Sequence, residues 1–175
     1  MTTQALRLRT FSEEATLGLG RALGAVLVPG VTVLFSGELG TGKTTLVRGI
    51  GGALGVTRVR SPSFTLVNEY RAEHFSIIHA DLYRLEPGGV DDLGLEEYLE
   101  APCVLLVEWA ERWTNPPERD VLKVFIKAAG EKNQSERGFE ISSFGGEADL
   151  ALQNLREAVK NGKTHSGVGL QFALD

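Results

Sequence analysis

The chain has few of the sequence features that are typical of extracellular and membrane proteins. A single cysteine, Cys103, occurs among its 175 residues, and one thiol forms no internal disulfide and no zinc site by itself. Cys103 begins the apolar run 103–107, which favours a small buried side chain. Residues 1–4 lack the apolar core of a secretory signal, and no apolar run approaches the length of a membrane span. We therefore expect a cytoplasmic protein.

An excess of basic charge is also absent. The formal net charge is -5 at pH 7, whereas proteins that bind polyanions over their whole surface are usually basic. The charge is uneven, because residues 43–60 hold four basic side chains and no acid, and residues 86–111 hold eight acids and no base. This distribution fits either an ordinary solvated surface or a phosphate-binding end with an acidic docking face for another protein.

Hydrophobic residues make up 42% of the chain, which is enough for one compact domain. We expect this domain over residues 1–160 and a tail without clear periodicity over 161–175. Apolar runs and alternation predict strands at 6–10, 31–36, 64–70, 75–80, 103–107, 121–128 and 139–144. Helical spacing predicts helices after the N-cap candidate Ser12 and at 45–54, 91–99 and 147–159. The order predicts an α/β fold with a mainly parallel sheet and antiparallel additions at one edge.

A glycine-rich loop joins the strand expected at 31–36 to the helix expected at 45–54. Its residues are Gly37, Glu38, Leu39, Gly40, Thr41, Gly42, Lys43 and Thr44, followed by Thr45. They fit the pattern G-x-x-x-x-G-K-[ST], in which the glycines let backbone N–H groups point at phosphate. The pattern predicts that Lys43 approaches the β and γ phosphates and that Thr44 coordinates Mg²⁺. The expected architecture is therefore the three-layer sandwich of P-loop NTPases.

Two acids directly follow expected strands and are candidates for holding Mg²⁺ or activating water. Glu108 follows residues 104–107, and Asp81 follows residues 75–80. Ligands of open α/β sheets collect at the carboxyl ends of the strands, and an unpaired buried charge is costly in a core. The alternative for each acid is a surface position paired with Arg84 or Arg112. The pattern leaves open which acid binds metal and which orients water.

Three further side chains lie near these motifs in the sequence. His79 shares a strand face with Asp81, so it either orients Asp81, touches phosphate or is structural. Trp109 either stacks on a base or packs beside the site. Thr65, in the segment 61–65, is a candidate hydroxyl for closing over the γ-phosphate, with a plain strand position as the alternative.

The ordered set of motifs resembles one family. The motifs are Gly37-Glu-Leu-Gly-Thr-Gly-Lys-Thr-Thr45, Ser61-Pro-Ser-Phe-Thr-Leu-Val67 with Tyr70, His79-Ala-Asp-Leu-Tyr-Arg84, Leu95-Glu-Glu-Tyr98 and Val107-Glu-Trp109. Over residues 11–144 they are similar to the TsaE family, the bacterial ATPases of tRNA threonylcarbamoyladenosine (t6A) biosynthesis. The chain departs from the family at Ala110, where proline is common.

The resemblance implies an activity, cofactors and partners. TsaE-like proteins bind and hydrolyse ATP with Mg²⁺, and they support TsaB and TsaD, which transfer a threonylcarbamoyl group to adenosine 37 of ANN-decoding tRNAs. The tRNA would be reached through that complex. By motif match, Lys43 and Thr44 hold phosphate and metal, Thr65 lies in a switch-like segment, and Asp81 and Glu108 are the essential acids.

Other P-loop classes remain as alternatives. A small-molecule kinase of this size usually carries a lid of clustered arginines, and the arginines here are scattered. A GTPase needs an Asn-Lys-x-Asp motif, which is absent. A binding module that uses ATP without hydrolysing it would need the same residues as a slow ATPase, so the sequence does not separate the two.

Overall fold

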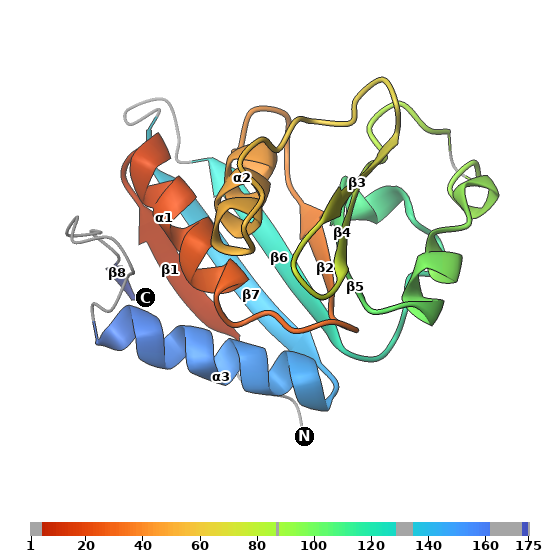
Figure 1. Ribbon diagram of the computed structural model, residues 1–175. Coiled ribbons are helices and arrows are strands. Elements are labelled where there is room, and N and C mark those ends of the chain that lie inside the picture. The colour runs from red at the N-terminus through yellow and green to blue at the C-terminus, as the bar shows by residue number, and fades with distance from the viewer. Residues whose placement is uncertain (1–4, 87, 129–134, 162–172, 175) are drawn as a thin grey trace.

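The computed structural model describes residues 5–86, 88–128, 135–161 and 173–174, which form one eight-stranded sheet with helices packed on it (Figure 1). The α-helices are α1 (Glu13–Gly24), α2 (Lys43–Ala53) and α3 (Gly146–Lys160), and the 3₁₀ helices are η1 (Asp91–Leu93), η2 (Leu95–Glu100) and η3 (Ala110–Arg112). The strands are β1 (Leu6–Thr10), β2 (Thr32–Ser36), β3 (Val67–Arg71), β4 (Ser76–Asp81), β5 (Cys103–Glu108), β6 (Val121–Ala128), β7 (Arg137–Phe144) and β8 (Ala173–Leu174). Within the described residues, no helix is long and apolar enough to cross a membrane.

The strand order is β3-β4-β5-β2-β6-β7-β1-β8. The neighbours β4–β5, β5–β2 and β2–β6 run parallel, and the remaining pairs run antiparallel. The α/β class and the antiparallel additions are therefore confirmed, but the additions lie at both edges of the sheet and leave a parallel centre of four strands. The reason is connection length, because β3–β4 and β6–β7 are joined by segments too short for the crossover that parallel pairing requires.

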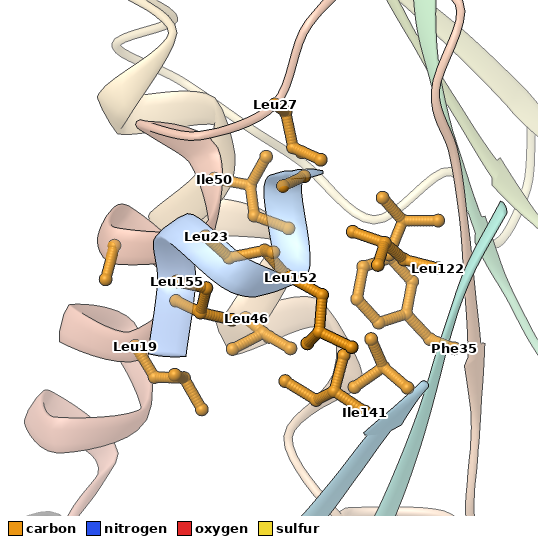
Figure 2. Close-up of a cluster of buried hydrophobic side chains, with 14 of the residues drawn as sticks. Leu19, Leu23, Leu27, Phe35, Leu46, Ile50, Leu122, Ile141, Leu152 and Leu155 are labelled. Carbon is orange, nitrogen blue, oxygen red and sulfur yellow. The ribbon is translucent and has the colours of Figure 1, made fainter. Parts of the chain in front are cut away.

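The three α-helices cover the same face of the sheet and enclose the larger hydrophobic cluster. Figure 2 shows side chains from α1, α2 and α3 meeting those of the strands, among them Leu23, Ile50, Leu152 and Phe35. Helix α1 begins as the sequence predicts, because the Ser12 hydroxyl accepts a hydrogen bond from the Ala15 N–H at 3.0 Å.

The opposite face of the sheet carries a smaller cluster beneath the 3₁₀ helices. Leu95 and Val90 pack there against β-strand side chains such as Leu105. This cover includes side chains of β4, β5 and β2 and Val121 at the start of β6, while Phe125 of β6 and Phe144 of β7 are exposed. The expected three-layer arrangement is thus complete over the half of the sheet that carries the glycine loop.

Helices α1 and α2 touch at glycines. A Cβ added at Gly20 would meet the backbone of Leu46 and Gly49, and one added at Gly49 would meet the backbone of Leu17 and Gly20. Only glycine, which has a hydrogen atom in place of a side chain, allows two helix backbones to approach so closely. The helix that follows the loop is therefore held directly against α1.

Three segments depart clearly from the sequence expectation, and the bounds of several other elements differ by one or two residues. The strand expected at 64–70 begins at Val67, because Leu66 adopts a left-handed φ of 66° and its N–H bonds to the Pro62 carbonyl in a turn. The helix expected at 91–99 is the pair of 3₁₀ helices η1 and η2. Two residues of the expected tail, in β8, pair antiparallel with Leu8 and Arg9 of β1.

Candidate nucleotide-binding site

The loop between β2 and α2 has the backbone shape that its glycines predict. Gly37, Gly40 and Gly42 have φ values of 139°, 78° and 100°, a region that favours glycine. A side chain at Gly37 would also run into the carbonyl oxygen of Ile126 in β6. The loop leads into the N-terminus of α2, where backbone N–H groups have no partner within the helix and favour an anion.

Lys43 lies buried at the start of α2 and spans the loop. Its Nζ donates hydrogen bonds to the carbonyl oxygens of Gly37 at 2.6 Å and Glu38 at 2.8 Å, and it lies 3.8 Å from the ring centroid of Trp109. Burial lowers the pKa of Lys43, and the charges of Glu108, Glu111 and Asp81 oppose that shift. The ammonium group is therefore desolvated and held beside the loop, where a triphosphate would provide stronger partners.

Thr44 and Glu108 form the second contact of the site. The Thr44 hydroxyl lies 3.0 Å from Oε1 and 2.9 Å from Oε2 of Glu108, to which it donates. Glu108 ends β5 and is only 2% exposed. On its other side, Nε2 of the fully buried His79 lies 2.8 Å from Oε1 of Glu108. Thus β5, β4 and α2 each contribute one side chain to this buried group.

Asp81 lies at the end of β4, directly opposite Glu108 in the parallel ladder between β4 and β5. Its Oδ2 accepts hydrogen bonds from the hydroxyls of Ser61 at 3.1 Å and Ser63 at 2.9 Å. Its Oδ1 accepts one from the backbone N–H of Tyr83 at 3.1 Å. The carboxyl ends of two neighbouring strands thereby place both acids at the same edge of the sheet, next to the loop.

These groups surround an open pocket of about 290 Å³. Its lining residues are Leu39, Gly40, Thr41, Gly42, Lys43, Thr44, Thr45, Ser61, Ser63, Asp81, Tyr83, Glu108 and Trp109. The rings of Tyr83 and Trp109 form one wall, with centroids 4.8 Å apart and planes tilted by 41°. The Lys43 ammonium lies over the Trp109 ring, and the carboxylates of Asp81 and Glu108 also line the pocket.

The structure brings most of the predicted site residues together, with differences in detail. Thr65 is exposed, does not line the pocket and donates to Asn68 Oδ1 at 2.9 Å. Ser61 and Ser63 of the same segment line the pocket and donate to Asp81. The shared strand face suggested that His79 could orient Asp81, but its ring contacts Glu108. Gly37 and Glu38 contribute through the carbonyl groups that hold Lys43.

Sequence reasoning missed Arg137 and a second pocket beside the loop. Arg137 in β7 donates from Nε to the Thr41 carbonyl at 3.0 Å and from Nη2 to the Gly40 carbonyl at 3.3 Å. A pocket of about 340 Å³ lies there, lined by Glu13, Thr16, Gly40, Thr41, Gly42, Thr45, Ser135 and Arg137. No local pattern signals Arg137, since it is 96 residues from Thr41 and reaches the loop only through the strand order.

The oxygen donors that line the pocket suit a hard divalent cation. Thr44 offers a hydroxyl, and Glu108 and Asp81 offer carboxylates, which are ligands that Mg²⁺ accepts. Within the described ranges, no group of three or more His, Cys, Asp or Glu side chains is arranged to hold a metal by itself. A cation here would therefore need oxygens from a bound phosphate as well as these protein ligands, as is usual for Mg²⁺.

The loop conformation, the buried lysine and the strand-end acids together define a P-loop protein of the α/β class. Comparison with known sequences identifies its family. The profile of the "Threonylcarbamoyl adenosine biosynthesis protein TsaE" family matches residues 10–137. The chain belongs to the TsaE family, which takes part in t6A biosynthesis on tRNA.

Individual relatives agree with this assignment. The "tRNA threonylcarbamoyladenosine biosynthesis protein TsaE" of Bacillus subtilis is 35% identical over 151 residues, covering 86% of this chain and 93% of the relative. The protein of the same name from a Nostoc species is 46% identical over 110 residues, covering 60% and 68%. The crystal structure of Bacillus subtilis YdiB superposes with a TM-score of 0.73 at 30% identity, covering 91% of this chain and 98% of that one.

Proposed function

We propose that this protein is a Mg²⁺-dependent ATPase that supports t6A modification of ANN-decoding tRNAs together with TsaB and TsaD. The single observation that carries the ATPase proposal is the contact between Thr44 and Glu108, with Lys43 beside it. A loop hydroxyl paired with a strand-end carboxylate is the arrangement that P-loop NTPases use for Mg²⁺. The proposal includes a cytoplasmic location, which stays a prediction.

The residues divide into roles by position. Loop N–H groups and the N-terminus of α2 hold the phosphates, and the Lys43 ammonium exchanges its bonds to the Gly37 and Glu38 carbonyls for phosphate oxygens. Thr44 and Glu108 would hold the cation, which would neutralise phosphate charge. Asp81 lies beside Glu108 and is tied to Ser61 and Ser63, so we assign it to water positioning and to sensing the γ-phosphate.

The second pocket suits the remainder of the nucleotide. It lies across the loop from the carboxylates, shares Gly40, Thr41, Gly42 and Thr45 with the first pocket and continues along α1. A triphosphate that threads the loop would pass its nucleoside to this side. Trp109, on the opposite wall, is then a packing partner of Lys43, and base stacking on it is not required.

Nucleotide binding and turnover can be tested together. Wild-type protein should bind ATP with Mg²⁺ in a calorimeter and release phosphate, and Lys43→Ala should bind no ATP at the same concentrations. Unchanged affinity in Lys43→Ala would refute the site. Phosphate release that requires an added small acceptor would indicate a kinase, and binding without any release, alone or with TsaB and TsaD, would indicate a binding module.

The partners need a separate experiment. Tagged protein should retain TsaB and TsaD from a bacterial lysate in the presence of ATP and Mg²⁺, and purified TsaB and TsaD should raise its rate of phosphate release. If the tagged protein retained neither TsaB nor TsaD, with ATP or without it, its assigned place in t6A biosynthesis would be contradicted. The proposal of a nucleotide site would not be affected.

A further inference from the structure

His79 is a buried polar side chain to which the proposed reaction gives no role. The residue is 0% exposed and lies in β4, on the sheet face that carries the loop helix. Its Nε2 is 2.8 Å from Glu108 Oε1, and Glu108 is itself buried. Among the described residues, Nδ1 has no hydrogen-bond partner. One ring nitrogen therefore contacts the site, and the other is buried without such a partner.

The hydrogen bonds determine where the ring proton lies. An ionised carboxylate accepts and does not donate, so the short contact to Glu108 requires the proton on Nε2. A proton on Nδ1 would add a buried N–H without an acceptor, which costs about 1–3 kcal/mol. A ring that carries its proton on Nε2 satisfies the contact and leaves only the lone pair of Nδ1 unused. His79 is thus a fixed donor to Glu108.

His79 distinguishes the two oxygens of Glu108. The Thr44 hydroxyl has one hydrogen and lies at nearly equal distances of 3.0 Å and 2.9 Å from the two oxygens, so it does not favour either. His79 contacts Oε1 alone. With Oε1 held, the carboxylate cannot rotate freely, and Oε2 keeps lone pairs directed toward Thr44 and the pocket.

We propose that His79 is a positioning residue that fixes Glu108 in the orientation in which its carboxylate and the Thr44 hydroxyl receive a divalent cation together. This inference rests on the proposed function, because it assigns Glu108 to that cation. It assigns no contact with ATP to His79, which does not line the pocket. His79 therefore governs the contribution of Mg²⁺ to ATP binding and leaves metal-free binding unchanged.

The test is a pair of ATP affinities, measured by calorimetry in excess Mg²⁺ and in EDTA. Loss of a side chain that orients a metal ligand commonly lowers metal affinity by about 10–100-fold. Leucine in His79→Leu fills the space of the ring without a hydrogen-bond donor. We expect this variant to lose most of the gain in ATP affinity that Mg²⁺ provides to the wild type. Its ATP affinity in EDTA should equal that of the wild type. His79→Gln, which places an amide N–H near the former Nε2, should recover most of that gain.

A matched control and the wild type separate the possible failures. His74→Leu removes a histidine that is exposed on the turn before β4 and should behave as the wild type. A full Mg²⁺ gain in His79→Leu would overturn the positioning role only. A wild type that binds ATP equally in EDTA and Mg²⁺ would instead refute the cation site of the proposed function.

A measurement on the unaltered protein covers the case in which the variants fold poorly. The chain has three histidines, and ¹⁵N-histidine labelling with long-range ¹H–¹⁵N spectra shows which nitrogen of each ring is protonated. Signals that disappear in the variants His74→Leu and His165→Leu belong to those two rings, so the remaining set belongs to His79. We expect a proton on Nε2 of His79, and a ring protonated on Nδ1 alone would overturn the proposal because Nε2 could not then donate to Glu108.

Discussion

At the scale of single residues, Glu108 is the side chain that links Thr44 of the loop helix to the buried His79 of the sheet. It accepts from Thr44, is bonded to His79 and ends a fully buried strand. We expect Glu108→Ala to bind ATP in EDTA like the wild type, because the hydrogen bonds of Glu108 within the described part of the chain go to Thr44 and His79 and not to the loop glycines. Phosphate release should fall by at least about 100-fold, since the cation loses its protein carboxylate.

Glu111 provides the matched control for this prediction. It lies three residues further along, is exposed and contributes only at a distance to the charge around Lys43. Glu111→Ala should keep phosphate release within a few-fold of the wild type in a coupled-enzyme assay. Equal loss in the two variants would show that general charge, and not the Glu108 contact, supports hydrolysis.

Cys103 gives a prediction about pH. It is 1% exposed at the start of β5, its thiol donates to the Tyr98 carbonyl at 3.2 Å, and burial, followed by the charge of Glu69, raises its pKa. The folded thiol thus keeps its proton to higher pH than the unfolded thiol. Its contribution to stability is present below the ordinary thiol pKa and is lost as pH rises toward the folded pKa.

The measurement is modification by a thiol reagent at pH 8. Folded protein should react slowly because little thiolate is present and the sulfur is covered, whereas protein in urea should react within minutes. Cys103→Ala supplies the blank, since Cys103 is the chain's only cysteine. Rapid stoichiometric labelling of the folded protein would contradict the buried position.

The sequence predicted those site residues whose roles depend on neighbours in the chain. Gly37, Lys43 and Thr44 act through the geometry of one loop, and the strand-end positions of Asp81 and Glu108 follow from hydrophobic runs. Contacts between distant segments carry no local signal. Ser61 and Ser63 meet Asp81 only because the turn at Leu66 folds back, and that turn also moves Thr65 away from the pocket.

At the scale of secondary-structure elements, the contact between α1 and α2 determines where the loop helix lies. We expect Gly20→Ala and Gly49→Ala each to lower the free energy of unfolding by about 1–3 kcal/mol, because the added methyl group meets backbone atoms that cannot move aside. Urea denaturation monitored by circular dichroism measures this. ATP affinity should fall as well, since α2 carries the loop.

Gly52 is the control glycine on the same helix. A Cβ there meets nothing within 4 Å, and the residue is exposed. Gly52→Ala should therefore stabilise the protein by about 0.4–1 kcal/mol through the helical preference of alanine and the reduced freedom of the unfolded chain. If all three variants shifted stability equally, the close approach of the two helices would not be the cause.

Local sequence patterns predict most of the helices and strands. They do not predict which strands pair with each other in the sheet. The alternation Leu6, Leu8 and the apolar run 103–107 predict strands that the structure contains as β1 and β5. Nothing local specifies that β1, the first strand, pairs with β7 and β8, because pairing depends on which apolar faces can be buried together. The two 3₁₀ helices replace the expected helix because Gly94, with a φ of 58°, interrupts it.

At the scale of the whole molecule, the site joins segments that are distant in the chain. The loop after β2, the ends of β4 and β5, the 61–63 segment and Arg137 of β7 all meet around it. A ligand bound there stabilises only the folded arrangement, so its binding free energy adds to the stability of the whole domain. At a free ligand concentration of 100 times the dissociation constant, the gain is about 2.7 kcal/mol.

The melting temperature therefore tests the site and its base preference together. For a domain of this size the gain corresponds to a rise in Tm of about 5–10 °C, measured by differential scanning fluorimetry with ATP and Mg²⁺. Lys43→Ala should show no rise, because the ammonium that grips the phosphates is gone. GTP should give a smaller shift than ATP at equal concentration, since the chain lacks the Asn-Lys-x-Asp motif that reads guanine. An equal shift with GTP would mean that recognition ends at the phosphates, and the adenine preference would then have no support.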